Sequence, residues 1–133
     1  MKKINDHFER GPYPAGVNSS LWEDTDRDHS LDVEIWYPAH DRYAGQDLDE
    51  VTQDVFVVPG LSGEEGSTAC QSAVRDAEAS SGKRYAVLLV HGFAGHRRES
   101  SFMGSHLASH GFVVVSADHT GSTYRDIDAL VKE

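Results

Sequence analysis

Two continuous apolar segments stand out in a chain that is otherwise largely polar. They cover residues 85–90 and 112–117, and each has the uninterrupted hydrophobicity of a parallel strand buried on both faces. Between them, residues 98–110 have helical spacing, with Phe102, His106 and His110 four positions apart. Gly111 supplies the left-handed residue that ends such a helix. The pattern predicts a right-handed βαβ unit over residues 85–121, with its two strands parallel and adjacent.

The N-terminal part of the chain has a different period. Residues 17–22 predict a short strand, and residues 31–37 alternate with period two. One face of the second segment carries Leu31, Val33, Ile35 and Tyr37, and the other carries Asp32, Glu34 and Trp36. This pattern predicts a strand with a single buried face that ends at Pro38. We expect residues 1–38 to supply N-terminal strands, the second of them an antiparallel addition at the sheet edge.

Residues 39–84 have no clear period, and loop signals interrupt them at 60–67 and 80–82. We expect an irregular excursion that holds at most one short strand or helix. Ser62 lacks the second spaced glycine of a nucleophile elbow, so we interpret it as a turn serine. Residues 122–133 begin the next helix or form a tail. The predicted class is α/β, with a mostly parallel sheet and an antiparallel N-terminal edge.

Charge and cysteine content exclude several classes of function. The chain has 133 residues with 22 acidic and 12 basic side chains, a formal net charge of −10, which disfavours nucleic acid and anionic lipid as partners. Cys70 is the only cysteine, so no intrachain disulfide can form. Residues 1–16 hold no apolar signal-peptide core, and no apolar run is long enough for a membrane span. We therefore expect a cytoplasmic protein.

Two loops follow the predicted parallel strands, residues 91–95 and 118–123. In open parallel sheets ligands bind beyond the carboxyl ends of the strands, so both loops should meet at one edge. Gly92 and Gly95 would let the backbone turn tightly, which would leave the N–H of Phe93 facing a carbonyl oxygen that becomes negative. From spacing alone, an ordinary glycine turn explains the first loop equally well.

Several segments together resemble one family of enzymes. They are residues 90–98 (VHGFAGHRR), 107–114 (LASHGFVV) and 118–121 (DHTG), with 11–17 (GPYPAGV) and 33–38 (VEIWYP) upstream. The chain resembles bacterial α/β-hydrolases related to platelet-activating factor acetylhydrolase, and is similar to dienelactone hydrolases and bacterial cutinases. The match runs from about residue 11 to residue 121 and is loose over 39–83. It implies that the chain is a single partial domain, the N-terminal portion of an α/β-hydrolase fold.

The resemblance also implies roles for the residues of both loops. Phe93 would give one oxyanion N–H and line the substrate pocket, Gly92 would form the turn, and His119 would edge the pocket. Structural roles near the site fall to His91, Gly95, Asp118 and Gly121, with Asp118 accepting backbone N–H groups. No Gly-x-Ser-x-Gly occurs in the 133 residues, and the triad of this fold lies at and after that motif. Asp118 and His119 come too early to be its acid and base.

We therefore expect the N-terminal fragment of a serine carboxylic-ester hydrolase, inactive alone, that needs no cofactor. Its partners would be a small ester substrate in the complete protein and a C-terminal half. The alternative is a non-catalytic module, derived from the same fold, that binds a small ligand or a protein. Extending the reading frame past Glu133 would separate the two.

Three further features have simpler interpretations. His106 and His110 have metal-ligand spacing, but no nearby Glu or Cys completes a ligand set, so we expect no metal. Residues 96–98 (HRR) place positive charge at the helix start, where it opposes the helix dipole; they could approach an anionic group or simply be solvated, and we favour solvation. The acidic residues 24–28 lack the glycine and glutamate of a calcium loop, and we expect them to form a surface turn.

Overall fold

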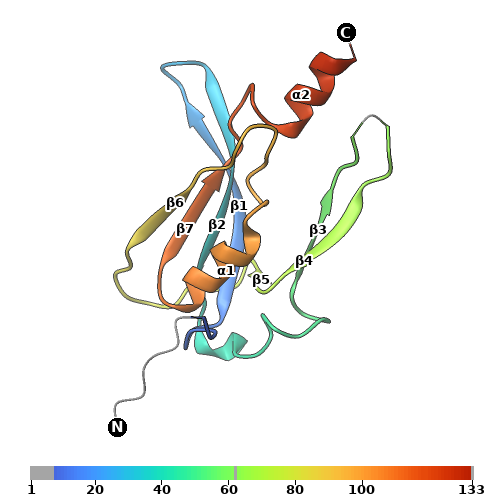
Figure 1. Cartoon of the computed structure of the whole chain (residues 1–133). Helices are drawn as coiled ribbons and strands as arrows, with labels where there is room; N and C mark the ends of the chain where they lie inside the picture. The colour runs from blue at the N-terminus through green and yellow to red at the C-terminus, as the bar shows by residue number, and fades with distance from the viewer. Residues whose placement is uncertain (1–7, 62, 133) are drawn as a thin grey trace.

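The computed structural model describes residues 8–61 and 63–132, and Ser62 lies outside the described residues. A five-stranded sheet in the order β5-β1-β2-β7-β6 carries helix α1 on one face, and a hairpin of β3 and β4 stands beside that helix (Figure 1). The elements are β1 (Ala15–Asp24), β2 (His29–Pro38), the 3-10 helix η1 (Asp41–Tyr43), β3 (Asp54–Val58), β4 (Ser67–Gln71), β5 (Val74–Arg75), β6 (Ala86–Leu89), α1 (Ser101–Ser109), β7 (Val113–Ala117) and α2 (Tyr124–Val131). No helix in this part of the chain has the length and apolar character that crossing a bilayer requires.

The βαβ unit is confirmed. Strands β6 and β7 are parallel neighbours, with Ala86 opposite Val113 and Leu89 opposite Ser116, and α1 connects them. The helix begins at Ser101 rather than at residue 98, and Gly111 follows its end with a φ of 101°. The α/β class and the antiparallel N-terminal strands are also confirmed. The complete sheet is mixed, since β1 pairs with β5 and β6 with β7 in parallel, while β2 is antiparallel to both its neighbours.

Strand β2 is not the edge strand that its alternation predicts. It lies between β1 and β7 in the middle of the sheet, and β1 is a full ten-residue strand rather than a short one. The prediction of a single buried face is wrong as well, because Glu34 and Trp36, on the supposed polar face, are both fully buried. The indole of Trp36 packs in the core, so the strand face that carries it is buried. Glu34 lies on the same face and is buried with it.

The core lies between α1 and the sheet. Val17, Trp36, Ala108 and Val114 are fully buried there. The helix does not use the predicted stripe, because Phe102 is 69% exposed while small residues of α1 face the sheet. Gly104 explains why this face of α1 meets the sheet, because a Cβ at this position would lie 2.5 Å from the Trp36 ring. The large indole therefore requires a helix face with almost no side chain.

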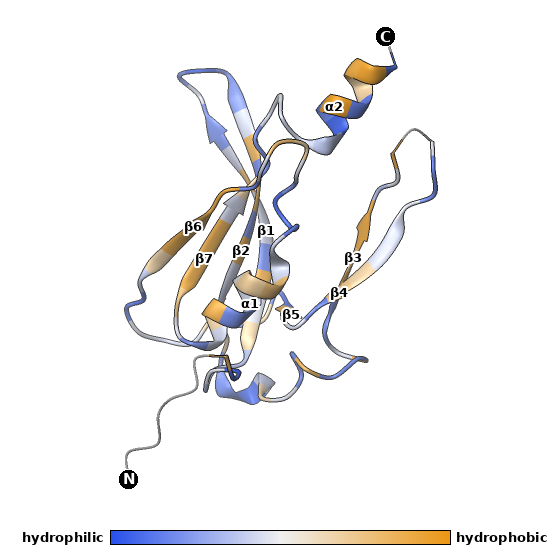
Figure 2. Ribbon diagram, in the orientation of Figure 1, coloured by the Kyte–Doolittle hydropathy of each residue, from blue (hydrophilic) through white to orange (hydrophobic). Residues whose placement is uncertain are grey.

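The opposite face of β6 is uncovered in the described residues. Val87 and Leu89 pack against the core, but Leu88 is 68% exposed and Val90, directly after the strand, is 65% exposed. The prediction of two buried faces is therefore wrong here, since no described element packs over the second face. Figure 2 shows the strand in strongly hydrophobic colour at the edge of the sheet.

Residues 39–84 contain more regular structure than the sequence predicts. Strands β3 and β4 pair in register from Asp54 opposite Gln71 to Val58 opposite Ser67, and β5 joins the main sheet beside β1. Hydrogen bonds tie the hairpin to the core: the indole N–H of Trp36 donates to Gln71 Oε1 at 2.7 Å, and Gln71 Nε2 donates to Asp54 Oδ2 at 2.6 Å. The acidic residues 25–28 form the turn between β1 and β2, as expected.

Candidate active site

The two loops at the carboxyl ends of β6 and β7 form one unit. The N–H of Ala94 donates to Ser122 O at 2.9 Å, and the N–H of Tyr124 donates to Gly95 O at 3.1 Å. The second loop ends in a capping box at the start of α2, where Thr123 and Asp126 satisfy each other's backbone N–H groups. The structure thus brings residues 91–95 and 118–123 together at one edge of the sheet, as the parallel strands require.

The turn in the first loop is made differently from the glycine turn that the sequence predicts. The left-handed residue is Ala94, with a φ of 60°, whereas Gly92 has open space around it and no positive φ. At Gly95 a Cβ would lie 2.2 Å from Glu99 Oε2, so the exposed glutamate side chain would have to move, and 3.0 Å from Gly92 O. Gly121 has a φ of 88° and makes the corresponding turn in the second loop. A non-glycine residue held in this region is strained, and such strain concentrates at functional sites.

The backbone amide of Phe93 differs from its neighbours in having no acceptor among the residues that the structure describes. The N–H of Gly92 donates to Glu99 Oε1 at 3.3 Å, that of Ala94 to Ser122 O, and that of Gly95 to Gly92 O at 3.0 Å. Within residues 8–61 and 63–132 no acceptor is recorded for the Phe93 N–H, and its side chain is 79% exposed. An N–H without an acceptor among the described residues, next to three that are bonded, can donate to an external acceptor.

His91 fixes the direction in which this amide points. Its Nδ1 lies 2.8 Å from Gly92 O, and its Nε2 lies 2.9 Å from the N–H of His119. A carbonyl needs a donor and a backbone N–H needs an acceptor, so the ring must carry its proton on Nδ1. Gly92 O therefore accepts from both His91 and Gly95. Because Gly92 C=O and Phe93 N–H belong to one planar trans peptide group, holding the oxygen inward aims the N–H outward.

His119 lies against His91 and is partly exposed. The two rings are 4.4 Å apart between centroids and tilted by 52°. The Nε2 atom of His119 is buried and has no hydrogen-bond partner among the described residues. A buried polar atom without a partner is rare, and its position beside the Phe93 loop makes it a candidate for contact with a ligand.

Asp118 organises the start of the second loop. Its Oδ1 accepts the backbone N–H of Arg97 at 2.6 Å, and its Oδ2 lies 2.5 Å from Nη1 of the same arginine. Its own N–H donates to Asp32 O at 2.9 Å, which anchors the loop to β2. Asp118 thus accepts a backbone N–H, the kind of contact expected of it, and in addition pairs with a cation that the sequence analysis placed in solvent.

The favoured interpretation of Arg97 and Arg98 as solvated is wrong, and the alternative, approach to an anionic group, is confirmed. Arg98 Nε donates to Glu34 Oε2 at 2.7 Å, and Arg97 Nε lies 3.6 Å from the same oxygen. Sequence reasoning missed Glu34 because its strand was read as half exposed. The available signal was an acidic residue two positions before a tryptophan, hence on the same face of the strand. A buried carboxylate needs cationic partners, and two adjacent arginines in a nearby loop can supply them.

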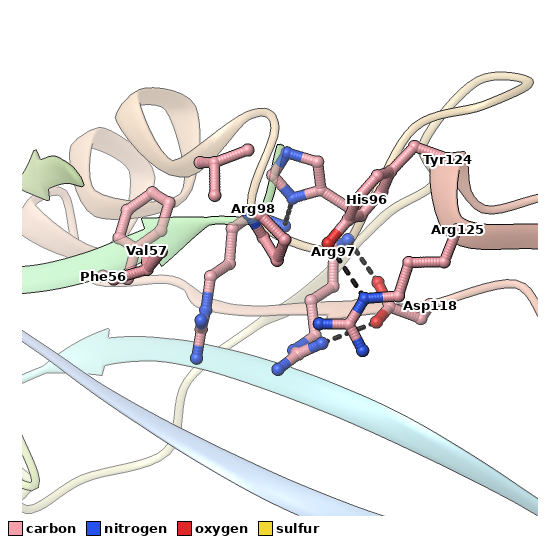
Figure 3. Close-up of a pocket in the computed structure, with 10 residues that line it drawn as sticks. Phe56, Val57, His96, Arg97, Arg98, Asp118, Tyr124 and Arg125 are labelled. Carbon is pink, nitrogen blue, oxygen red and sulfur yellow. Dashed lines mark hydrogen bonds and ion pairs between the residues drawn. The ribbon is translucent and has the colours of Figure 1, made fainter. Parts of the chain in front are cut away.

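A small cleft separates this loop from the hairpin. Phe56 and Val57 of β3 line one side, and His96, Arg98 and Tyr124 line the other (Figure 3). Burial lowers the pKa of His96, whose Nδ1 accepts the N–H of Arg98 at 3.1 Å. Arg98 also lies over the Phe56 ring, 5.3 Å from its centroid. The hairpin therefore contacts the loop that carries Phe93, an arrangement that the sequence analysis did not foresee.

The described part of the chain contains no group of three or more side chains arranged to hold a metal ion. The rings of His106 and His110 lie near each other, 4.8 Å between centroids. His110 Nε2 is 2.9 Å from Glu9 O, so this ring bonds to the N-terminal segment.

Comparisons with known proteins identify the family. No curated protein sequence matches the chain. Among solved structures, a ferulic acid esterase from Streptomyces cinnamoneus is similar, with a TM-score of 0.62 and 24% identity over 84% of this chain. The match spans 35% of that esterase, so the chain corresponds to about a third of its length. The family model described as platelet-activating factor acetylhydrolase, isoform II, matches residues 8–127. Because that model matches most of the chain, the chain belongs to the platelet-activating factor acetylhydrolase isoform II family.

Proposed function

We propose that the chain supplies one oxyanion donor, the N–H of Phe93, to a serine hydrolase that cleaves carboxylic esters through an acyl-enzyme. The observation that carries the proposal is the amide itself. It has no acceptor among the described residues, it follows a parallel strand of the main sheet, and its peptide group is held by two donors to Gly92 O. An N–H fixed before the reaction loses no energy to reorganisation when the charge forms.

The chemistry follows from that geometry. A serine oxygen attacks the ester carbonyl, the carbonyl oxygen becomes negative, and Phe93 N–H stabilises it by roughly 3–4 kcal/mol. The alcohol then leaves, and water releases the acyl group from the serine. The residue after the nucleophile would supply the second N–H in this fold. The exposed Phe93 ring would line the pocket and His119 would edge it, while Asp118, Gly95 and Gly121 shape the loops.

On this proposal the nucleophile, acid and base are not among the 133 residues, because no Gly-x-Ser-x-Gly occurs in them. The uncovered apolar face of β6 supports the same interpretation, since further sheet and helix of the hydrolase would bury it. The purified chain should therefore show no serine-directed turnover of p-nitrophenyl acetate, and measurable turnover would contradict the proposal.

The decisive experiment removes the amide proton from the assembled enzyme. The DNA after codon 133 should encode Gly-x-Ser-x-Gly, in frame or in an adjacent gene, and the product would be assayed with this chain. Phe93→Pro deletes the N–H and should lower kcat by about 10²–10³. Phe93→Ala keeps the N–H and should retain most of kcat. Equal activity of the two variants would refute the oxyanion role, and absence of the motif would favour a binding module.

A further inference from the structure

We propose that Glu34 is a positioning residue that couples the β3–β4 hairpin to the loop carrying Phe93, through a continuous chain of ion-paired side chains. The inference rests on the proposed function for its catalytic meaning, but the coupling is a property of this chain alone. The hairpin wall of the cleft and the oxyanion donor would then hold one fixed relative position.

The first half of the chain of contacts joins the hairpin to the sheet. Arg75 of β5 donates from Nε to Asp54 Oδ1 at 2.9 Å and from Nη2 to Asp54 Oδ2 at 2.7 Å, a two-point contact. The remaining Nη1 of the same guanidinium donates to Glu34 Oε1 at 2.7 Å. One rigid planar group therefore spans two carboxylates, which a lysine could not reproduce.

The second half joins the sheet to the loop. Glu34 Oε2 accepts from Arg98 Nε at 2.7 Å and from the Ser19 hydroxyl at 3.0 Å, and Arg97 lies 3.6 Å away. Arg97 continues to Asp118 through its guanidinium and its backbone N–H. Figure 3 shows the side chains of Arg97 and Asp118 meeting beneath the loop.

Burial makes these links depend on one another. Glu34 is fully buried and the Asp54 side chain is 5% exposed, so neither carboxylate can replace a lost partner with bulk water. Three carboxylates, Glu34, Asp54 and Asp118, face three guanidinium groups, which balances the charge. Burial by itself lowers the pKa of Arg75, but the contacts with Asp54 and Glu34 outweigh it and the pKa is raised. A buried pair that loses one member leaves an uncompensated charge, and the remaining groups must move to neutralise it.

The chain of contacts ends close to the reactive amide. Arg97 and Arg98 are four and five residues from Phe93, and the intervening backbone is held by the contacts of Ala94 and Gly95. The segment between Phe93 and Arg98 is short and held by hydrogen bonds, so movement of Arg98 would displace it as a unit. The Asp54 side chain bonds to Gln71 and Arg75. We nevertheless expect a substitution at Asp54 to change the mobility of the loop that carries Phe93.

The test is amide hydrogen exchange on the 133-residue chain, with Asp54→Asn as the variant. The amides to follow are those of Ala94, Gly95 and Arg97, which are hydrogen-bonded in the loop. The matched control is Asp47→Asn, which breaks the partly buried ion pair between Arg10 and Asp47 outside this chain of contacts. Exchange is compared after correction for the global stability of each variant, measured by urea unfolding.

Coupling predicts that Asp54→Asn speeds exchange of the three loop amides at least about tenfold more than Asp47→Asn does. Arg75→Lys keeps the charge but loses the two-point contact with Asp54. It should also speed exchange of the three loop amides more than Asp47→Asn does. It serves as the main variant if Asp54→Asn fails to fold. If only the hairpin amides respond to both variants, the proposal is overturned. Exchange requires no catalysis, so this result is independent of Phe93→Pro, and a failed oxyanion role would leave the coupling intact.

Discussion

Replacing His91 by phenylalanine tests the argument that its ring fixes the Gly92–Phe93 peptide. The substitution keeps a buried aromatic ring of similar size and removes both nitrogen atoms. The N–H of His119 then loses its acceptor at 2.9 Å, and Gly92 O loses one of its two donors. Since Gly95 still donates to Gly92 O, the second loss is incomplete.

The expected destabilisation follows from these two bonds. A buried donor left without an acceptor costs about 1–3 kcal/mol, and one lost hydrogen bond costs about 0.5–1.5 kcal/mol. His119 is partly exposed, so water offsets part of the first cost. We therefore expect His91→Phe to lower the free energy of unfolding by about 2 kcal/mol, which is roughly an eighth to two fifths of the 5–15 kcal/mol of an ordinary domain.

Urea unfolding, followed by tryptophan fluorescence, measures this free energy, with the buried Trp36 expected to change more than the half-exposed Trp22. The control is His110→Phe, which removes an exposed hydrogen bond to Glu9 O and should cost much less. In the assembled hydrolase, His91→Phe should also lower kcat more than it raises KM, because the amide would no longer be held. If His91→Phe and His110→Phe agree within about 0.5 kcal/mol, the proposed role of the ring is refuted.

Three further results are expected. Gly104→Ala should destabilise the chain by about 1–2 kcal/mol in urea unfolding, because overpacking against Trp36 costs more than the roughly 1 kcal/mol that alanine adds to a helix. Because burial lowers the pKa of His96, the unfolded chain binds the proton more readily, so unfolding midpoints should fall as pH drops below about 6.5, and His96→Gln should flatten that dependence. The chain should associate through its uncovered apolar face, and Leu88→Lys with Val90→Lys should shift sedimentation towards monomer.

The features that the sequence predicts correctly are those set by neighbouring residues. A continuous apolar run, a helical period and Gly111 lie within 33 residues, and together they specify the parallel unit of β6, α1 and β7. The two loops meet because the strands before them are parallel and adjacent, which follows from the same local pattern. The acidic turn between β1 and β2 is also local, and it forms where the polar run indicates.

The features that the sequence does not predict depend on partners far along the chain. Glu34 and Arg98 are 64 positions apart, and Trp36 and Gln71 are 35 apart, so no window of sequence contains both members of either pair. The residues that anchor the hairpin, such as Gln71 to Trp36, are not recognisable from local sequence, and residues 39–84 then look irregular. The alternation of β2 misleads for the same reason: period two separates its faces, but the neighbouring strands and α1 determine which face is buried.

Local sequence pattern and partners far along the chain both determine the site. Residue spacing alone therefore left the interpretation of the first loop open. An ordinary glycine turn and an oxyanion loop share the same residues, and they differ in whether one N–H is left without an acceptor. Here the left-handed conformation at Ala94 allows its own N–H to bond to Ser122, while His91 and Gly95 hold the carbonyl that precedes Phe93. The N–H groups of Gly92, Ala94 and Gly95 each have an acceptor, whereas that of Phe93 has none among the described residues. Strain at a non-glycine residue costs about 1–3 kcal/mol. Asp28 and Asp76 also have a positive φ, so the conformation of Ala94 alone does not distinguish the two kinds of loop. On the proposed function, this strain is part of a loop that presents the Phe93 amide.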